Sequence, residues 1–280
     1  MVGDRTRGFV ELIRPGNAIA AGFLTFIGAF VADAFADPVM IGAAVGATIA
    51  ATGAGMSIND YFDREIDRIN QPDRAIPRGA VTPREALGFS IVLFAIAVAL
   101  VLLLPVLAIV IAGVNLFALV AYTKLFKGFS GLGNIVVGYL TGSAFLFGAA
   151  AVGSVTVAVL VLFALAALST VAREIVKDVE DMEGDREEGL RTLPIVVGDR
   201  TSLILAAVVL ALAVLASPVP FIRGTFGIAY LVLVIPCDLL MLYSVYEGFS
   251  NPTAGQSHLK YSMYLATVAF VVGRATTIIG

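Results

Sequence analysis

Residues 39–67 read VMIGAAVGATIAATGAGMSINDYFDREID, an apolar stretch that ends in three aspartates. Residues 154–185 read SVTVAVLVLFALAALSTVAREIVKDVEDMEGD and follow the same order. Both acidic ends have the spacing Asp-x-x-Asp-x-x-x-Asp, at Asp60, Asp63 and Asp67 and again at Asp178, Asp181 and Asp185. About 20 apolar residues are enough to cross a bilayer as a helix. Each stretch therefore predicts a membrane-spanning helix with carboxylates at one end.

The rest of the chain is also rich in apolar residues. Of its 280 residues, 59% are hydrophobic and 14% are charged, and the mean hydropathy is +0.96. Soluble domains contain roughly 25% charged residues, so the composition predicts an all-α, polytopic membrane protein. We expect nine transmembrane helices, at residues 16–34, 39–61, 84–104, 105–124, 132–151, 154–177, 202–218, 225–247 and 259–279.

Basic residues are concentrated on one side of these expected spans. Of the 18 Lys and Arg residues, only Arg223 and Arg274 fall on the other side. Because Lys and Arg are enriched in cytoplasmic loops, we expect a multi-pass protein of the cell membrane with its N-terminus and both aspartate motifs in the cytoplasm. The charged N-terminal segment does not have the pattern of a cleavable signal peptide.

The spacing of the aspartates places each motif on one face of a helix. A helix advances about 100° per residue, so one arc holds Asn59, Asp60, Asp63 and Asp67, and another holds Lys177, Asp178, Asp181 and Asp185. If the two helices face each other, their carboxylates converge, and they repel one another unless a cation neutralises them. Such oxygen ligands suit Mg²⁺, which commonly shares its coordination with substrate phosphates. We therefore expect an Mg²⁺ site, with the six aspartates as candidate catalytic residues and Asp178 among the metal ligands. The alternative is a pair of acidic helix ends in solvent.

Cationic side chains near the motifs are candidates to bind phosphate oxygens. They are Arg74, Arg78, Lys124, Lys127, Lys177 and Arg191. Each could instead be an anchor at the membrane surface, although Lys177 and Arg191 lie inside or just beyond a motif. Tyr122 precedes Lys124 by two positions and either contacts substrate or belongs to an aromatic belt at the membrane surface.

A diphosphate held at the mouth of an apolar bundle indicates a lipid-like substrate. A divalent cation would activate the diphosphate as a leaving group, and the apolar spans would keep water from the allylic group that it releases. This arrangement favours transfer of a prenyl group to an acceptor nucleophile.

At these residues the chain resembles the UbiA superfamily of intramembrane prenyltransferases, whose two signatures match the two aspartate motifs. The resemblance begins at Ile13-Arg14-Pro15-x-Asn17, continues through Tyr122-x-Lys124 and Gly133-Asn134, and ends at residues 260–266. It implies nine transmembrane helices around a central cavity that opens toward the cytoplasmic side and the membrane. It also implies Mg²⁺ as cofactor and a polyprenyl diphosphate as donor.

The resemblance assigns roles to residues of this chain. The metal ligands would be Asn59, Asp63, Asp67, Asp181 and Asp185. The diphosphate would be bound by Lys124, Lys177 and the loop arginines. Arg14 and Asn17 would line the acceptor side.

Three stretches resemble the branch of the superfamily that makes archaeal ether lipids, namely residues 58–74, 172–185 and 192–198. Such enzymes transfer a geranylgeranyl group from its diphosphate to the free hydroxyl of geranylgeranylglyceryl phosphate, a lipid-phosphate acceptor, and so form the second ether bond. We accordingly expect these substrates and contact with membrane lipids, but no nucleic acid and no obligate protein partner.

Two other functions fit parts of the pattern. One is a UbiA-type enzyme with an aromatic acceptor, as in quinone biosynthesis. The other is a cation-coupled secondary transporter, although transporter sites usually lie near the middle of the membrane. We expect residues 1–280 to form one domain, and the two similar motifs, at 59–67 and 178–185, suggest a pseudo-repeat.

A few polar residues and glycines have roles that the sequence leaves open. Asp238 falls inside an expected span, where it either lines the cavity or packs as a paired or protonated side chain. His258 is expected to be solvated. The glycines at 53, 55, 138, 142 and 148 are expected to permit close helix packing.

Overall fold

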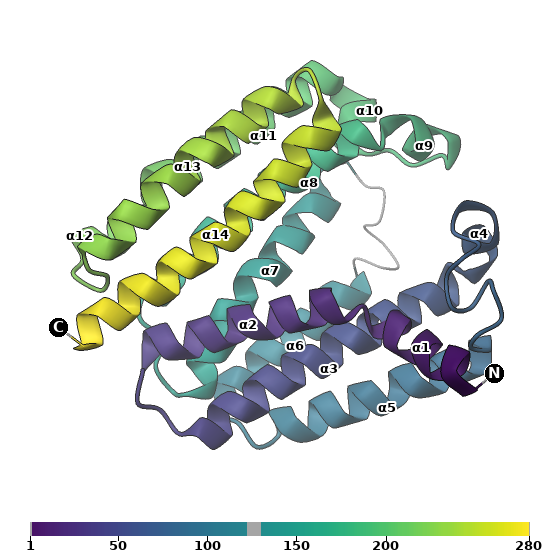
Figure 1. Ribbon diagram of the computed structural model, residues 1–280, viewed down its shortest axis with the longest axis horizontal. Coiled ribbons are helices and arrows are strands. Elements are labelled where there is room, and N and C mark those ends of the chain that lie inside the picture. Colours follow the sequence, from purple (N-terminus) through teal and green to yellow (C-terminus); the bar gives the residue numbers. More distant parts are fainter. Residues whose placement is uncertain (1, 122–129, 280) are drawn as a thin grey trace.

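The computed structural model describes residues 2–121 and 130–279, and helices form most of both segments (Figure 1). The long helices are α2 (Pro15–Ala32), α3 (Pro38–Phe62), α5 (Pro83–Val101), α6 (Val106–Ala121), α7 (Leu132–Ala151), α8 (Val157–Glu180), α11 (Asp199–Ala216), α13 (Ile228–Gly248) and α14 (Pro252–Ile279). The short helices are α1 (Val2–Ile13), α4 (Arg64–Asn70), α9 (Met182–Glu187), α10 (Leu193–Val197) and α12 (Val219–Ile222).

The prediction of a polytopic helical membrane protein is confirmed. In the described part of the chain, eight helices are long and apolar enough to cross a membrane. The expected span at 105–124 corresponds to α6, a shorter apolar helix of 16 residues. The last residues of that expected span, from 122 onward, lie outside the described residues. Large apolar side chains such as Phe117, Leu215 and Ile235 are exposed along the spans, as expected for helices that face lipid.

Local sequence signals fix where several spans begin. At the start of α5, the Thr82 hydroxyl accepts a hydrogen bond from Glu85 N, and the Glu85 carboxylate accepts one from Thr82 N. This capping box satisfies backbone donors that have no partner within the helix. Proline occupies the first turn of this helix, where its missing N–H costs nothing. Pro105 likewise separates α5 from α6, because a proline cannot continue a helix without loss of a hydrogen bond.

Helix α7 is packed closely against both α2 and α8, and glycines make these contacts possible (Figure 1). A Cβ at Gly148 would overlap the backbone of Thr25, and a Cβ at Gly28 would overlap the backbone of Phe145. On another part of α7, a Cβ at Gly142 would meet the backbone of α8 at Phe163. Small residues at helix crossings let backbones approach closely where lipid provides no hydrophobic driving force. The predicted packing role is thus confirmed for Gly142 and Gly148.

The two aspartate motifs lie at the same end of the bundle. Figure 1 shows α4 and α9, which follow the two long apolar helices, at the end where the N-terminus also lies. We call this the motif end. The C-terminus and α12 lie at the opposite end. Arg274 and Arg223, on α14 and just after α12, therefore lie away from both motifs.

Replacement of Gly148 by alanine should destabilise the bundle, because the added Cβ would force the α2 and α7 backbones apart. We expect a loss of about 1–3 kcal/mol, as for other overpacked interiors, seen as a lower melting temperature of the purified protein in detergent. Gly42→Ala is the matched control, since Gly42 is also helical but has nothing within 4 Å of the added Cβ. Equal melting temperatures for the two variants would contradict this account of the crossing.

Candidate active site

The first motif is not one continuous helix, which corrects the single helical arc expected from the sequence. Helix α3 ends at Phe62 and α4 begins at Arg64, with Asp63 between them at φ −83° and ψ 1°. Asp63 is itself bonded to both sides, because Asp63 N donates to Asn59 O (2.8 Å) and Asp67 N donates to Asp63 O (2.8 Å). A ψ near 0° instead of the helical value of about −42° bends the chain at Asp63 and interrupts the helix there. Such bridge-region conformations are common at active-site residues.

The second motif bends at the equivalent aspartate. Asp181 has φ −86° and ψ 0° and separates α8 from α9. Asp181 N donates to Lys177 O (2.9 Å), and Asp185 N donates to Asp181 O (3.0 Å). The two motifs therefore share a backbone geometry as well as a sequence spacing.

Two arginines hold the first motif. The Arg14 guanidinium donates to Asp60 (2.7 Å), and Arg74 donates to both carboxylate oxygens of Asp67 (2.8 and 2.7 Å) and lies 3.6 Å from Asp60. Both carboxylates are almost completely buried, with Asp60 6% and Asp67 5% exposed. Because buried charges are costly without partners, Arg14 and Arg74 are needed to neutralise Asp60 and Asp67 when no other cation is bound.

The backbone positions Arg14 for this contact. Arg14 lies between α1 and α2 at φ 45°, the one non-glycine residue with positive φ in the described segments. The following Pro15 disfavours the right-handed helical conformation at Arg14, so α1 ends at Ile13 and the chain turns into α2. Arg14 was expected to line the acceptor side, but its guanidinium lies on the first motif.

The second motif has different partners. Asn134 of α7 donates to Asp178 (2.9 Å), and Lys177 Nζ lies 3.1 Å from Asp181. Burial raises the pKa of the Asp185 carboxyl, and the negative charge of nearby Asp181 raises it further. A cation close to this carboxyl would favour its ionised form and so oppose both effects.

The oxygen donors fit Mg²⁺ in chemistry, but their expected convergence is not confirmed. Both motifs supply only carboxylate and amide oxygens, which this cation prefers. Within residues 2–121 and 130–279, no three acidic, histidine or cysteine side chains are close enough to hold a metal ion. The physical reason is that carboxylates repel one another, and those described above lie instead beside Arg14, Arg74 and Lys177.

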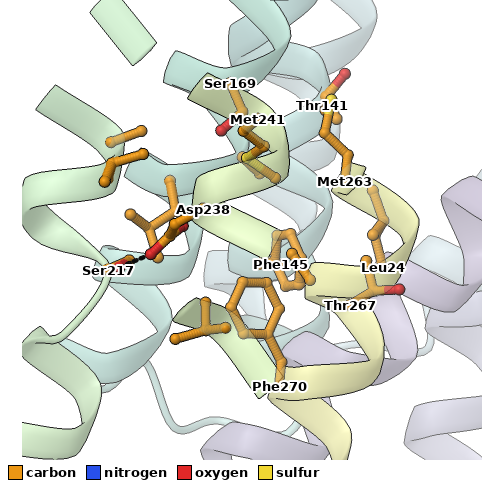
Figure 2. Close-up of a pocket in the computed structure, with 16 residues that line it drawn as sticks. Leu24, Thr141, Phe145, Ser169, Ser217, Asp238, Met241, Met263, Thr267 and Phe270 are labelled. Atoms are coloured by element: carbon orange, nitrogen blue, oxygen red, sulfur yellow. Dashed lines mark hydrogen bonds between the residues drawn. The ribbon is translucent and has the colours of Figure 1, made fainter. Parts of the chain in front are cut away.

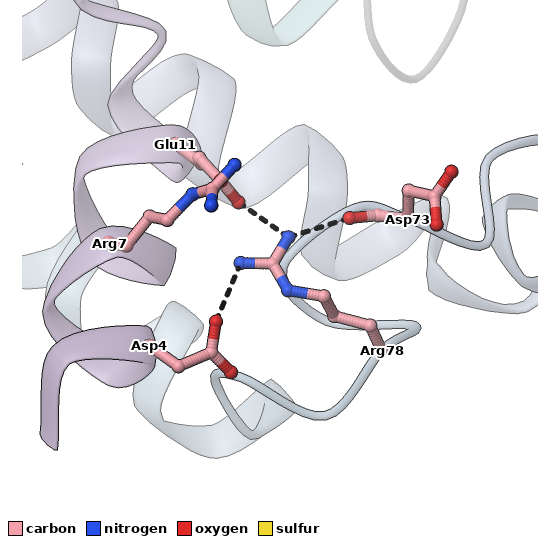
Figure 3. A network of polar contacts seen from close by, with 5 residues as sticks. All are labelled: Asp4, Arg7, Glu11, Asp73 and Arg78. Atoms are coloured by element: carbon pink, nitrogen blue, oxygen red, sulfur yellow. Dashed lines mark hydrogen bonds and ion pairs between the residues drawn. The ribbon is translucent and has the colours of Figure 1, made fainter. Parts of the chain in front are cut away.

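Arg78 lies in a separate network of polar contacts (Figure 3). Its guanidinium contacts Glu11 (2.7 Å) and Asp4 (3.4 Å) of α1 and donates to the backbone oxygen of Asp73 (2.6 Å). The Arg78 hydrogen bond lowers the pKa of the Glu11 carboxyl, and Arg7 lowers it further. This network joins the loop after the first motif to α1 and occupies the guanidinium that was expected to bind diphosphate.

The other predicted site residues are dispersed. Arg191 is exposed in the segment after α9, and Asn17 is exposed in the first turn of α2. The predictions for Tyr122, Lys124 and Lys127 fall outside the described residues.

An apolar pocket lies between the spans α2, α7, α8, α11, α13 and α14 (Figure 2). Its lining includes Leu24, Phe145, Met263 and Phe270. Its polar lining residues include Ser169 and Asp238. Asp238 accepts a hydrogen bond from Ser217 (2.5 Å), so this carboxyl is both paired and exposed to the pocket.

The chain is matched by the model of the UbiA prenyltransferase family over residues 21–268. The chain belongs to this family. A digeranylgeranylglyceryl phosphate synthase from Natronomonas pharaonis is 61% identical and covers 98% of this chain and 99% of its own length. Another from Methanosarcina mazei is 41% identical, with 95% and 98% covered. The chain is therefore a membrane prenyltransferase of the digeranylgeranylglyceryl phosphate synthase type.

Solved structures show the same fold. One is the structure of a digeranylgeranylglyceryl phosphate synthase in membranes. It is 39% identical to this chain, with a TM-score of 0.83, and the match covers 96% of this chain and 98% of that protein. A UbiA homologue from Archaeoglobus fulgidus bound to GPP and Mg²⁺ has a TM-score of 0.76 at 18% identity, again with 96% and 98% covered. At that identity the second likeness concerns the fold alone.

Arg173 is a cation inside the apolar span α8, and the sequence did not single it out as a site residue. The Arg173 guanidinium contacts Glu174 (2.7 Å) and Gln256 of α14 (3.0 Å). Its position could have indicated a functional role, because an ionisable residue within a membrane span is costly and commonly functional. The contact with Gln256 could not be predicted from the sequence, because it depends on how α14 packs on α8.

Replacement of Arg74 by alanine should destabilise the protein in the absence of divalent cations, because Asp67 would be buried without a partner. We expect a loss of roughly 1–3 kcal/mol, since Arg74 is 33% exposed and water screens the pair. Mg²⁺ should raise the melting temperature of this variant more than that of the wild type. Arg84→Ala, a change at an exposed arginine of the same end, is the control. If Mg²⁺ shifts all three proteins equally, Asp67 does not take part in metal binding.

Proposed function

We propose that this enzyme transfers a geranylgeranyl group from geranylgeranyl diphosphate to the free hydroxyl of geranylgeranylglyceryl phosphate. The observation that carries the proposal is the pair of identically bent, oxygen-rich motifs at one end of a bundle that also contains an apolar pocket. The relatives named as digeranylgeranylglyceryl phosphate synthases support the choice of substrates.

Asn59, Asp63 and Asp67 of the first motif, with Asp178, Asp181 and Asp185 of the second, are the residues that would hold Mg²⁺. When bound, the cation would neutralise the charge that develops on the leaving diphosphate. Asp60 has a different part in this proposal. Its carboxylate is held by Arg14 and lies near Arg74, so it fixes both guanidinium groups beside the site.

The donor diphosphate requires cations from the protein as well. Lys177 lies on the last turn of α8, and its ammonium group is within the second motif. We assign it to the diphosphate, together with Arg74 and Arg191 and, outside the described residues, Lys124 and Tyr122. Lys177 would exchange its contact with Asp181 for phosphate oxygens when the donor binds.

The reaction exchanges one carbon–oxygen bond for another. The bond between the allylic carbon and the diphosphate breaks, and the diphosphate leaves with the electron pair. The acceptor hydroxyl oxygen then bonds to that carbon and loses its proton, which gives an ether. The apolar pocket excludes water, which would otherwise compete with the hydroxyl for the allylic group.

We further propose that the motif end faces the cytoplasm and that residues 1–280 form a single domain with a pseudo-repeat. The positive-inside rule supports the orientation, since Arg223 and Arg274 both lie away from the motif end. The matching bends at Asp63 and Asp181 support the repeat.

A transfer assay on the purified protein tests the reaction. With labelled geranylgeranyl diphosphate and Mg²⁺, we expect an ether product with geranylgeranylglyceryl phosphate, and none when EDTA replaces Mg²⁺. Product with 4-hydroxybenzoate alone would overturn the lipid acceptor and favour the aromatic branch of the family. Absence of product with both acceptors would overturn both proposed acceptors.

Substitution of either bent aspartate should abolish turnover. We expect Asp63→Ala and Asp181→Ala to insert and fold normally but to release no diphosphate. Asp199→Ala, a change at an exposed carboxylate on α11, is the control and should keep wild-type activity. Near-normal turnover in either variant, measured as diphosphate release, would rule out the proposed metal ligands.

Loss of the Lys177 ammonium group should weaken donor binding more than acceptor binding. We expect Lys177→Ala to raise the donor KM about tenfold or more, as for a lost charge-assisted hydrogen bond, with the acceptor KM nearly unchanged. Steady-state kinetics with each substrate varied in turn measures both values. An unchanged donor KM and an unchanged rate would remove Lys177 from the site.

A further inference from the structure

Two polar atoms one turn apart on α8 are buried without a partner. Among the residues that the structure describes, Thr170 Oγ1 and Arg173 Nε have no hydrogen bond. Nearly all buried polar groups in proteins are paired, and an exception requires an explanation. Both atoms precede the second motif, and neither is used in the mechanism above.

The guanidinium of Arg173 is only partly satisfied. Its Nη1 contacts the Glu174 carboxylate (2.7 Å), which fixes one edge of the group. Nη2 donates to the neutral amide oxygen of Gln256 (3.0 Å), and Nε has no partner. The edge formed by Nε and Nη2 therefore has a single partner among the described residues, the neutral Gln256 amide. This edge is a planar pair of donors with the geometry that binds two oxygens of a phosphate.

Arg173 lies directly beyond the apolar pocket on the side of the motif end. Ser169, one turn before Arg173 on α8, lines the pocket. Met263, two turns after Gln256 on α14, also lines it (Figure 2). The bond between Arg173 and Gln256 thus joins the two helices just beyond the pocket. A lipid with its chain in the pocket would present its headgroup to this guanidinium.

The position of Arg173 suits the phosphate of the acceptor better than the diphosphate of the donor. Lys177 lies four residues beyond Arg173, about 6 Å further along the axis, and belongs to the motif that would bind metal and diphosphate. In a glyceryl phosphate, the free hydroxyl is at most two carbon atoms from the phosphoester. The acceptor phosphate must therefore bind close to the donor diphosphate, on a cation that the donor does not use.

We propose that Arg173, supported by Gln256, binds the phosphate of the acceptor lipid and so determines specificity for a phosphorylated acceptor. This inference rests on the proposed function, since it assigns part of the same site. The acceptor phosphate would displace the Gln256 amide oxygen from Nη2 and take up the free Nε. Glu174 would keep the guanidinium plane in place.

The test compares a phosphorylated acceptor with the same lipid without phosphate. Geranylgeranylglyceryl phosphate and geranylgeranylglycerol are each offered to the wild type and to Arg173→Gln, Arg173→Lys, Gln256→Glu and Gln256→Ala. For Arg173→Gln we expect a tenfold to hundredfold rise in the KM of the phosphorylated acceptor, the range for a lost charged hydrogen bond, and a donor KM within about twofold of the wild type. The preference of the wild type for the phosphorylated lipid should disappear.

The other variants separate binding from folding. Arg173→Lys keeps the charge without the planar pair of donors, so it should restore part of the preference. Gln256→Glu places a carboxylate where the phosphate would bind and should raise the acceptor KM more than Gln256→Ala does. Arg200→Gln is the matched control, because Arg200 is an exposed arginine at the start of α11, and it should behave as the wild type. Melting temperatures show whether each variant is folded.

Two results would overturn the proposal. One is a preference for the phosphorylated lipid that survives in Arg173→Gln, and the other is a rise in the donor KM with an unchanged acceptor KM. Direct binding of the labelled phosphorylated lipid without donor separates this inference from the reaction itself. If the wild type gives no ether product, the proposed function fails. Arg173-dependent binding would still support the phosphate site, and equal binding by wild type and Arg173→Gln would exclude it.

Discussion

The structure depends on the placement of buried carboxylates at the edge of an apolar bundle. Asp60 and Asp67 are almost fully removed from solvent, which is unfavourable for charged groups without a counterion. Arg14 and Arg74 supply that charge in the described structure. This requirement explains the turn at Arg14 and the path of the loop after α4, whose residues Ala75 and Ile76 pack with Leu12 of α1.

The close crossings of α7 with α2 and α8 also help to position side chains at the motif end. Glycines bring α7 against α2 and α8 at backbone distance, and α7 carries Asn134, which contacts Asp178 at the start of the second motif. A rigid α7 thereby fixes an amide beside a carboxylate on a neighbouring helix. Hydrogen bonds between helices from side chains such as Asn contribute to helix association in membranes.

The sequence was sufficient to predict the spans and the motifs, because both depend on local composition and spacing. It could not show the bends at Asp63 and Asp181, since the spacing of each motif fits one continuous helix equally well. It also could not choose among partners for each charge. Arg78 was expected near the diphosphate, but the distant Glu11 and Asp4 hold it. Such pairings depend on how α1 packs against the loop after α4, and the spacing of residues in the sequence does not reveal that packing.

The two motifs share a backbone geometry but differ in their counterions. The first is held by two guanidinium groups, whereas the second has an amide, one lysine and a partly satisfied arginine nearby. Two anionic lipids can react at a site rich in carboxylates only if cations separate every pair of like charges. If Arg173 binds the acceptor phosphate as proposed, the second anion lies beside the second motif, where Arg173 Nε is an unpaired donor among the described residues. In the proposed reaction, the two acidic motifs would therefore serve different substrates, because their neighbouring side chains differ.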